Sequence, residues 1–200
     1  EEQWAEALEQ PAHLVLAGPP NAGKSSLFNA WLRAQRSTVT DAAGTTRDSV
    51  GERLRLGHGA DAWTLQLVDT AGLWQDAVGV DAAAVLRTEA ALESAWRVLW
   101  VFDAAQAPDS RATLALSRAR AGDLRLLHRC DRGESWSPEN ELGGSWLRGS
   151  VLTDPEGLLT SLEIALNRSL GPPPEPGACL PLGRGLRAQL REWAEKGSGR

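Results

Sequence analysis

The sequence contains no tyrosine, no methionine and only two cysteines among its 200 residues. Cys130 and Cys179 have neither the spacing of metal ligands nor the density of a secreted disulfide framework, so they indicate a reducing, cytoplasmic environment. Apolar runs of about eighteen residues, the length that spans a membrane, are also missing, and the first residues do not resemble a signal peptide. We therefore expect a cytoplasmic protein that makes no membrane contact. Because the chain begins at Glu1 rather than at a methionine, we expect it to be a piece of a longer protein.

Runs of basic residues are likewise missing, and the formal net charge is -5. An acidic protein without a basic patch has no general attraction for nucleic-acid phosphates, so the composition gives no support to a nucleic-acid-binding role. Hydrophobic residues make up 42% and charged residues 24% of the chain, which is usual for a folded domain.

The length fits one α/β domain with short appendages. We expect that domain at residues 12–170, preceded by an N-terminal helical extension at 1–11. Residues 171–178 are rich in proline and predict a semi-rigid linker, and 179–200 predict a C-terminal helical tail.

Short apolar stretches alternate with stretches of helical spacing along the predicted domain. We predict strands at 13–17, 50–56, 63–68, 97–102, 124–128 and 145–148, and helices at 24–34, 81–94, 110–121 and 156–170. The second and third strands are close enough in sequence to form a hairpin, whereas most later strands are separated by helices. The predicted fold class is therefore α/β, with a mostly parallel six-stranded sheet, one antiparallel edge strand and helices on both faces.

A phosphate-binding motif lies between the first strand and the first long helix. Residues 18–25 read Gly-Pro-Pro-Asn-Ala-Gly-Lys-Ser, which fits the pattern of a phosphate loop in its expected strand–loop–helix context. Glycines let backbone N–H groups converge on an anion, and the helix N-terminus adds partial positive charge. Lys24 is expected to contact the outer phosphates and Ser25 to bind magnesium. The residues predicted to contact the nucleotide here are Asn21, Ala22, Gly23, Lys24, Ser25 and Ser26.

A second set of polar residues follows the third predicted strand. Asp69 comes at the end of that strand, where a carboxylate can hold magnesium through water, and the Gly72 N–H is placed to meet a γ-phosphate. The loop between the phosphate loop and the hairpin contains Gly-Thr-Thr-Arg-Asp at 44–48, whose hydroxyls could complete the magnesium shell. Taken alone, this loop could equally be a solvated turn.

Together these strings resemble the TrmE–Era-like P-loop GTPases, and most closely the G domain of the MnmE/TrmE family of tRNA-modification GTPases. The resemblance spans residues 12–170 and depends on three strings: Gly-Pro-Pro-Asn-Ala-Gly-Lys-Ser-Ser-Leu-Phe-Asn-Ala at 18–30, Val-Thr-Asp-Ala-Ala-Gly-Thr-Thr-Arg-Asp at 39–48, and Asp-Thr-Ala-Gly-Leu at 69–73. It implies a P-loop GTPase fold that binds GTP or GDP with magnesium and hydrolyses GTP.

Several residue roles are implied by the resemblance alone. Thr46 would bind magnesium in the GTP state, and Asn21 would hold a potassium ion together with the loop that contains Thr40 and Thr45. In the family this ion neutralises charge between the β- and γ-phosphates when two G domains pair, so a homodimer is an implied partner. Contact with RNA or the ribosome is also implied only by resemblance. For Asn21, an ordinary turn residue is the alternative interpretation.

Two departures from the family pattern affect the site. Guanine is normally read by Asn-Lys-x-Asp, whereas residues 128–131 here read His-Arg-Cys-Asp, so Asp131 alone is expected to accept from the guanine N–H groups. Arg129 is expected to lie over the base as the lysine would. The last nucleotide-binding string appears as Ser150 and Val151. The glutamate that orients the attacking water has no clear equivalent, and Asp76 is the candidate, with a solvated loop carboxylate as the alternative.

The sequence thus predicts a GTPase switch in which Lys24, Thr46, Gly72 and Asp76 act on the reacting phosphates. Its magnesium ligands are Ser25 and Thr46, supported by Asp69. The alternative is a nucleotide-binding interaction module with little turnover, which would keep the phosphate loop but bind the base weakly.

Overall fold

The computed structural model describes residues 12–38, 51–57, 63–69 and 89–170. The predicted extension at 1–11, the linker at 171–178 and the tail at 179–200 lie outside these residues.

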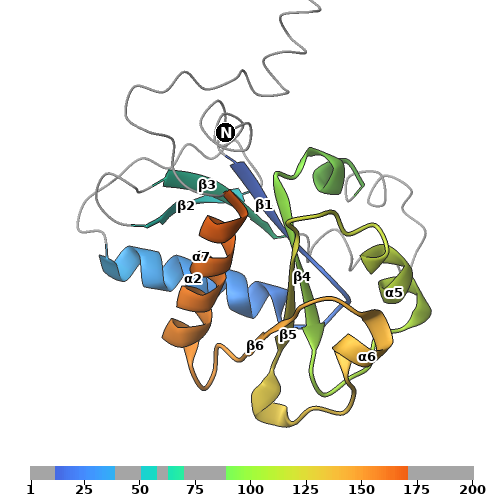
Figure 1. The fold of residues 1–200 in the computed structure, drawn as a ribbon. Coiled ribbons are helices and arrows are strands. Elements are labelled where there is room, and N and C mark those ends of the chain that lie inside the picture. The colour runs from blue at the N-terminus through green and yellow to red at the C-terminus, as the bar shows by residue number, and fades with distance from the viewer. Residues whose placement is uncertain (1–11, 39–50, 58–62, 70–88, 171–200) are drawn as a thin grey trace, which may run out of the picture.

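The described chain forms one six-stranded sheet (Figure 1). Its strands are β1 (Ala12–Ala17), β2 (Gly51–Leu56), β3 (Trp63–Asp69), β4 (Arg97–Asp103), β5 (Leu124–His128) and β6 (Leu147–Gly149), in the order β2-β3-β1-β4-β5-β6. Only β2 and β3 pair antiparallel, and β2 lies at the edge. The predicted fold, a mostly parallel sheet with one antiparallel edge strand, is therefore confirmed.

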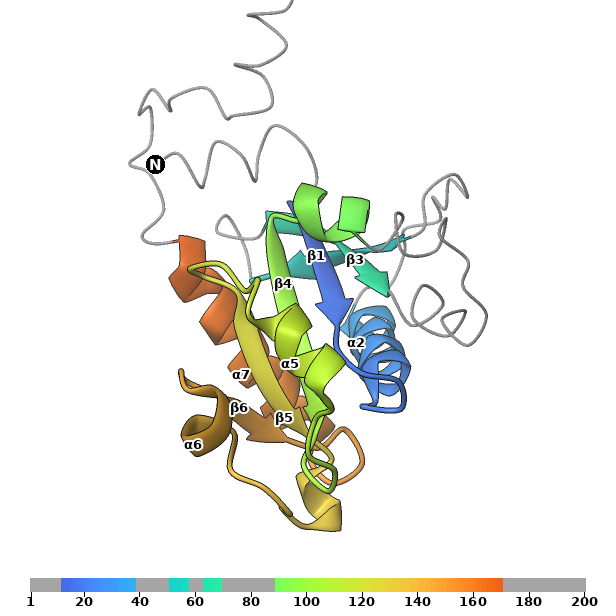
Figure 2. The ribbon, with the colours of Figure 1, turned by 90° about the vertical axis from the view of Figure 1, so that its right-hand side faces the viewer.

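Helices cover both faces of this sheet (Figures 1 and 2). They are α2 (Lys24–Thr38), α5 (Ser110–Leu116), α6 (Pro138–Leu142) and α7 (Pro155–Leu170), with a 3-10 turn, η3, at Cys130–Arg132. Residues 89–94 are also helical. Figures 1 and 2 place α2 and α7 on one side of the central strands and α5 on the other.

The alternation of side chains along β4 explains the two layers. Leu99 and Val101 point into a core shared with α2 and α7, whereas Trp100 and Phe102 point into a second core shared with α5. Since neighbouring side chains of a strand point to opposite faces, a strand that is apolar throughout is buried on both sides. The strand ends that bear the polar loops therefore lie at one edge of a sheet held rigidly between two helical layers.

Three of the described elements differ by more than one residue from their predicted bounds. Helix α2 continues to Thr38, four residues beyond its predicted end at residue 34. Helix α5 stops at Leu116 instead of continuing to residue 121, because Asp123 binds the backbone N–H groups of both Arg120 and Val98 and holds the chain in a turn. Strand β6 begins at Leu147 rather than at residue 145 because a preceding turn contains Gly143 at φ 65°. The Trp146 indole donates to the carbonyl oxygen of Gly143 and closes that turn.

The edge strand β2 is covered by a side chain of α2. The Gln35 amide donates from Nε2 to the Arg55 carbonyl oxygen over 2.7 Å and accepts from the Arg55 N–H through Oε1 over 3.1 Å. A side-chain amide thus continues the backbone pairing of the sheet by one residue, which protects an edge that would otherwise be open to other strands.

Candidate nucleotide-binding site

The loop from Gly18 to Gly23 joins the end of β1 to the start of α2, and its two glycines are required by their surroundings. Gly18 has a φ of 138°, and a Cβ at that position would overlap the carbonyl oxygen of Val101. Gly23 has a φ of 97°, and a Cβ there would overlap the His128 ring. Both positions combine a left-handed backbone with a close approach, so only glycine fits. The main chain can therefore curve tightly around a small polar space.

Lys24 is the first residue of α2 and is buried, with 3% of its surface exposed. Its Nζ donates to the carbonyl oxygens of Gly18 over 2.9 Å and Pro19 over 2.7 Å. Burial lowers the pKa of Lys24 to about 8, while the nearby Asp69 carboxylate acts in the opposite direction. The side chain is therefore folded back over its own loop, where its ammonium group is close to any anion that the loop binds.

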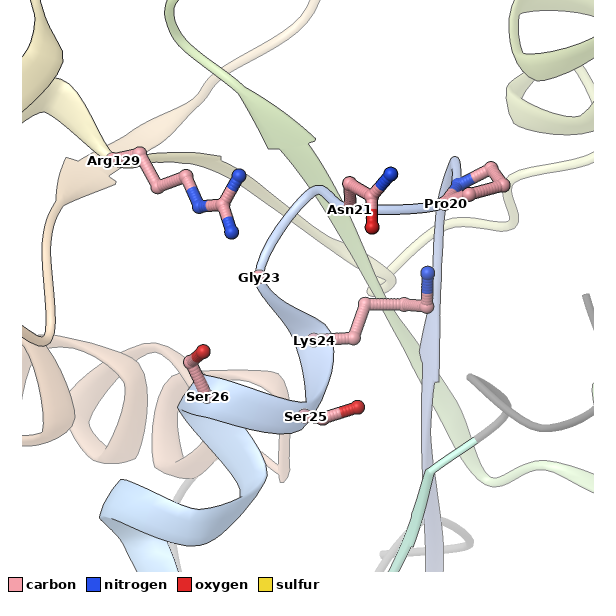
Figure 3. A pocket seen from close by; sticks show the side chains of 7 residues that line it. All are labelled: Pro20, Asn21, Gly23, Lys24, Ser25, Ser26 and Arg129. Carbon is pink, nitrogen blue, oxygen red and sulfur yellow. The ribbon is translucent and has the colours of Figure 1, made fainter. Parts of the chain in front are cut away.

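A cavity of about 170 Å³ lies over this loop. It is lined by Pro20, Asn21, Gly23, Lys24, Ser25, Ser26 and Arg129 (Figure 3). In Figure 3 the Lys24 and Ser25 side chains extend to one side of the loop, and Ser26 and Arg129 lie toward the other. Asn21 has a φ of 63° and is exposed at the turn of the loop. The lining thus combines two cationic side chains with hydroxyl groups and the start of a helix, a combination suited to phosphate.

Asp69 is the last residue of β3 and lies beside the phosphate loop. The parallel pairing of β1 with β3 sets Asp69 opposite Leu16, two residues before Gly18. Asp69 is half-buried, and its carboxylate is close enough to Lys24 to oppose part of the lowering of the Lys24 pKa that burial causes. The register of the sheet therefore places the Asp69 carboxylate near Lys24, the residue that lines the cavity together with Ser25.

The other side of the cavity is formed by the segment that follows β5. Arg129 has a left-handed φ of 60°, and its NH1 nitrogen lies 3.0 Å from Oδ2 of Asp103 at the end of β4. Arg132 lies 3.5 Å from the same oxygen, and the other carboxylate oxygen of Asp103 accepts from the Ala105 N–H. A carboxylate that is 7% exposed therefore holds the Arg129 guanidinium in place at the cavity.

Comparison with known proteins agrees with this geometry. Residues 13–128 match the model of the family described as 50S ribosome-binding GTPase, and this match covers more than half of the chain. The chain belongs to this GTPase family. The matched part of the GTPase runs from β1 to the last residue of β5, and so includes the phosphate loop and Asp69. The predicted GTPase domain is thereby confirmed.

The curated relatives agree with the resemblance to the MnmE/TrmE family. The GTPase is 45% identical over 107 residues to the tRNA modification GTPase MnmE of Xanthomonas oryzae pv. oryzae (strain MAFF 311018), which is 54% of this chain and 23% of that protein. It is 43% identical over 119 residues to MnmE of Alkalilimnicola ehrlichii, which is 60% of this chain and 25% of that protein. The matched region thus spans about a quarter of the length of these relatives.

Several predicted site residues of the GTPase lie outside the part that the structure describes. They are Thr40, Thr45, Thr46, Gly72 and Asp76, which carry the predicted potassium loop, the γ-phosphate contact and the candidate water-orienting acid. Among the helices that are described, none is long and apolar enough to cross a membrane.

Three of the residues predicted to bind the base, Asp131, Ser150 and Val151, are described but do not line the cavity. Asp131 is exposed within η3, and Ser150 is buried, with its hydroxyl oxygen accepting from the Leu152 N–H. Val151 is half-buried, and its backbone N–H points to the His128 ring. Arg129 lies at the cavity wall, as expected for the residue in the lysine position, but its guanidinium is paired with Asp103.

Sequence reasoning overlooked two residues of this site, Asp103 and His128. Asp103 follows the apolar run from Val98 to Phe102 and ends β4 as Asp69 ends β3, and this similarity could have drawn attention to it. His128 was read only as a departure from the family's asparagine. Its contacts with the phosphate loop depend on tertiary packing, because the two segments are 106 residues apart.

Proposed function

We propose that this domain binds GTP and GDP together with magnesium, hydrolyses GTP to GDP and phosphate, and acts as a molecular switch. The observation that carries the proposal is the arrangement of Lys24 within the phosphate loop. A buried cation at a helix N-terminus, beside a cavity that the same loop lines, suits a ligand with several adjacent negative charges.

The donors beside this loop fit a magnesium ion. Magnesium prefers hard oxygen ligands and keeps several waters, so it needs few protein groups. The Ser25 hydroxyl lines the cavity and would bind the ion directly, while Asp69 would hold a coordinated water. Thr46, which the family resemblance implies as a further ligand, would join them from outside the described residues. When bound, the ion would neutralise charge on the phosphates.

In the proposed reaction, a water oxygen attacks the γ-phosphorus while the bond from that phosphorus to the β–γ bridging oxygen breaks. The products are GDP, inorganic phosphate and one proton. Lys24 would stabilise the charge that moves onto the bridging oxygen, which requires it to be protonated at the start. Gly72 would contact the γ-phosphate, and Asp76 would orient the water. The loops that contain Thr46 and Gly72 would change conformation when the γ-phosphate leaves.

Guanine selection would depend on Asp131. Asp131 is exposed in the turn after β5, at the same end of the sheet as the phosphate loop. Its carboxylate can accept from the ring N–H and the exocyclic amine of guanine. Arg129 would pack along the base or ribose while Asp103 holds its guanidinium. The loop at Ser150 and Val151 would close the base pocket from the β6 side.

A potassium ion, a second G domain and other partners belong to the same proposal. Asn21 would be the side-chain ligand for potassium, completed by the loop at Thr40 and Thr45 when two G domains pair in the cytoplasm. The named relatives are tRNA modification GTPases, and the similarity to them covers only their nucleotide-binding region. We therefore assign the GTP reaction to these residues, and leave RNA or ribosome contact to be tested.

The decisive experiment is single-turnover hydrolysis of GTP in potassium and in sodium, with release of GDP followed in parallel. A GTPase switch is expected to turn over GTP, to release GDP measurably and to bind GTP in preference to ATP. Tight nucleotide binding without turnover in either salt would instead favour the interaction module, which the altered guanine-reading string also fits. Failure to bind any guanine nucleotide would overturn both functions.

A further inference from the structure

The last residue of β5, His128, lies at the junction of the phosphate side and the base side of the site. Its side chain is 1% exposed, and its ring packs so closely on Gly23 that a Cβ there would overlap the ring. The parallel pairing of β5 with β4 and β6 sets His128 opposite Asp103 on one side and Gly149 on the other. His128 therefore touches the phosphate loop from the same strand end that leads into Arg129 and Asp131.

Both ring nitrogens of His128 have backbone partners. Nδ1 lies 3.1 Å from the carbonyl oxygen of Ala22 in the phosphate loop, and Nε2 lies 3.4 Å from the backbone nitrogen of Val151. A carbonyl oxygen can only accept and a backbone N–H can only donate. The ring must therefore carry its proton on Nδ1 and accept at Nε2, so both contacts together require the neutral form.

These two contacts connect segments that have no sequence proximity. Ala22 lies in the loop that would hold the phosphates, and Val151 lies in the loop that would close on the base. The main chain of His128 is also fixed, because its carbonyl oxygen accepts from the Ala104 N–H over 2.8 Å. One side chain thus sets the distance between the two halves of the nucleotide site.

We propose that His128 is a positioning residue for guanine nucleotide, which aligns the phosphate loop with the Ser150–Val151 loop by donating to Ala22 and accepting from Val151. This inference rests on the proposed nucleotide-binding function and deepens it. An asparagine amide also carries one donor and one acceptor group, so the family's residue at this position has the same hydrogen-bonding capacity. The histidine therefore keeps a hydrogen-bond donor and an acceptor at this position of the altered string.

A histidine differs from an asparagine in that it can gain a proton. Burial lowers the pKa of His128, the hydrogen bond to Ala22 opposes this effect, and the nearby Arg129 adds to it, whereas Asp131 and Asp103 act weakly in the opposite direction. Protonation would place a hydrogen on Nε2, where it would face the Val151 N–H and remove the acceptor.

The other charged side chains near this junction are already engaged. The Lys24 ammonium is directed to the carbonyl oxygens of Gly18 and Pro19, and Asp154 accepts from the Gly157 N–H at the start of α7. The alignment made by His128 is therefore expected to hold at neutral pH and to be lost in acid, when the ring takes up its second proton.

The test compares wild type with His128→Asn and His128→Leu, using a fluorescent GDP analogue for affinity and urea unfolding for folding. We expect His128→Leu to bind GDP at least about tenfold more weakly, because the Ala22 carbonyl oxygen and the Val151 N–H both lose their partner. His128→Asn should stay within about threefold of wild type. As the pH falls from 7.5 to well below the ordinary histidine pKa of about 6.5, the ratio of wild-type to His128→Asn affinity should fall once the ring is protonated, since protonation of GDP itself affects both proteins equally.

The possible outcomes distinguish a failure of the His128 positioning role from a failure of the proposed nucleotide-binding function. If wild type binds no GDP, the proposed function fails and the inference fails with it. If wild type binds GDP but folded His128→Leu binds it equally well, only the positioning role is overturned. Should His128→Leu fail to fold, the comparison with His128→Asn still decides, because a loss of affinity of more than about tenfold in folded His128→Asn would show that a donor and an acceptor at this position do not suffice, and would overturn the positioning role.

Discussion

Lys24 is the residue of the site whose burial is expected to destabilise the folded protein while its charge favours phosphate binding. Its ammonium is buried in the folded protein, and its pKa is lowered from 10.5 to about 8 chiefly by loss of solvent. The sequence contains no tyrosine and only two lysines, so few other groups titrate in this range. The stability of the nucleotide-free protein above neutral pH should therefore report on this one side chain.

Because the folded protein holds the Lys24 proton less tightly than the unfolded chain does, the destabilisation is complete below pH 8. It should disappear as the pH rises from about 8 to 10.5, and the difference corresponds to roughly 3 kcal/mol at about 1.4 kcal/mol per factor of ten. We expect the free energy of unfolding of wild type, relative to Lys24→Met, to increase over this range. Urea unfolding at pH 7.5 to 10 in EDTA without nucleotide measures it, and parallel pH profiles would contradict the prediction.

The same substitution tests the phosphate loop itself. Lys24→Met keeps most of the side-chain volume but removes the charge that would face the phosphates. The affinity for GTP should therefore fall by at least about a hundredfold. Calorimetric titration with GTP measures the loss. Near-normal affinity in a folded variant would refute the assignment of this loop.

Asp131 is the residue on which guanine preference is predicted to depend. A neutral amide oxygen accepts more weakly than a carboxylate and the amide adds a donor, so Asp131→Asn should reduce the preference for GTP over ATP by at least about tenfold. Competition of each nucleotide against a fluorescent GDP analogue provides the measurement. Glu141→Gln, which removes an exposed acid from α6, is the matched control. Equal competition by ATP and GTP in the wild type would show that Asp131 does not read the base.

Helix α7 packs against the same core as the β2–β3 hairpin and contacts strand β6. Its buried leucines recur at helical spacing, and Asn167 accepts from the Trp63 indole over 2.8 Å. Leu162 is fully buried, whereas Ile164, two residues away, is 47% exposed. The helix therefore offers a pair of apolar positions that differ mainly in burial.

We expect Leu162→Ala to lower the free energy of unfolding by about 2–5 kcal/mol, because it leaves a cavity beneath the sheet. Ile164→Ala should cost less than about 1 kcal/mol. Chemical denaturation of both variants makes the comparison. Equal losses would show that α7 does not pack as the structure describes.

For the whole molecule, the potassium proposal links catalysis to pairing of G domains. An ion between the phosphates is most effective when charge shifts in the transition state, so Asn21→Ala should lower turnover more than it weakens GDP binding. Potassium should accelerate hydrolysis by wild type more than sodium does, and this difference should grow with protein concentration.

Hydrolysis rates in the two salts, measured over a hundredfold range of protein concentration, test this prediction. Asn29→Ala, which truncates an exposed asparagine on α2, is the matched control and should behave as wild type. A potassium effect that persists in Asn21→Ala, or a rate that does not respond to the choice of cation, would remove the ion from the mechanism.

The sequence alone was sufficient for the features that depend on neighbouring residues. The phosphate loop could be predicted because its glycines, Lys24 and Ser25 are consecutive, and a strand and a helix flank them in the correct order. The sheet could be predicted because β4 is apolar from Val98 to Phe102 and helices separate most of the parallel strands. Helix α6 was missed because it is only five residues long, too short to show a helical period.

The features that only the tertiary structure decided involve residues distant in sequence. The pairing of Arg129 with Asp103 depends on the register between β4 and β5, and the contacts of His128 with Ala22 and Val151 depend on three segments meeting at one sheet edge. No local pattern records such contacts, because hydrogen bonds and ion pairs depend on the distance between atoms and not on separation along the chain. The string that departs from the family pattern at 128–131 therefore showed its hydrogen-bonding role only after the chain was folded.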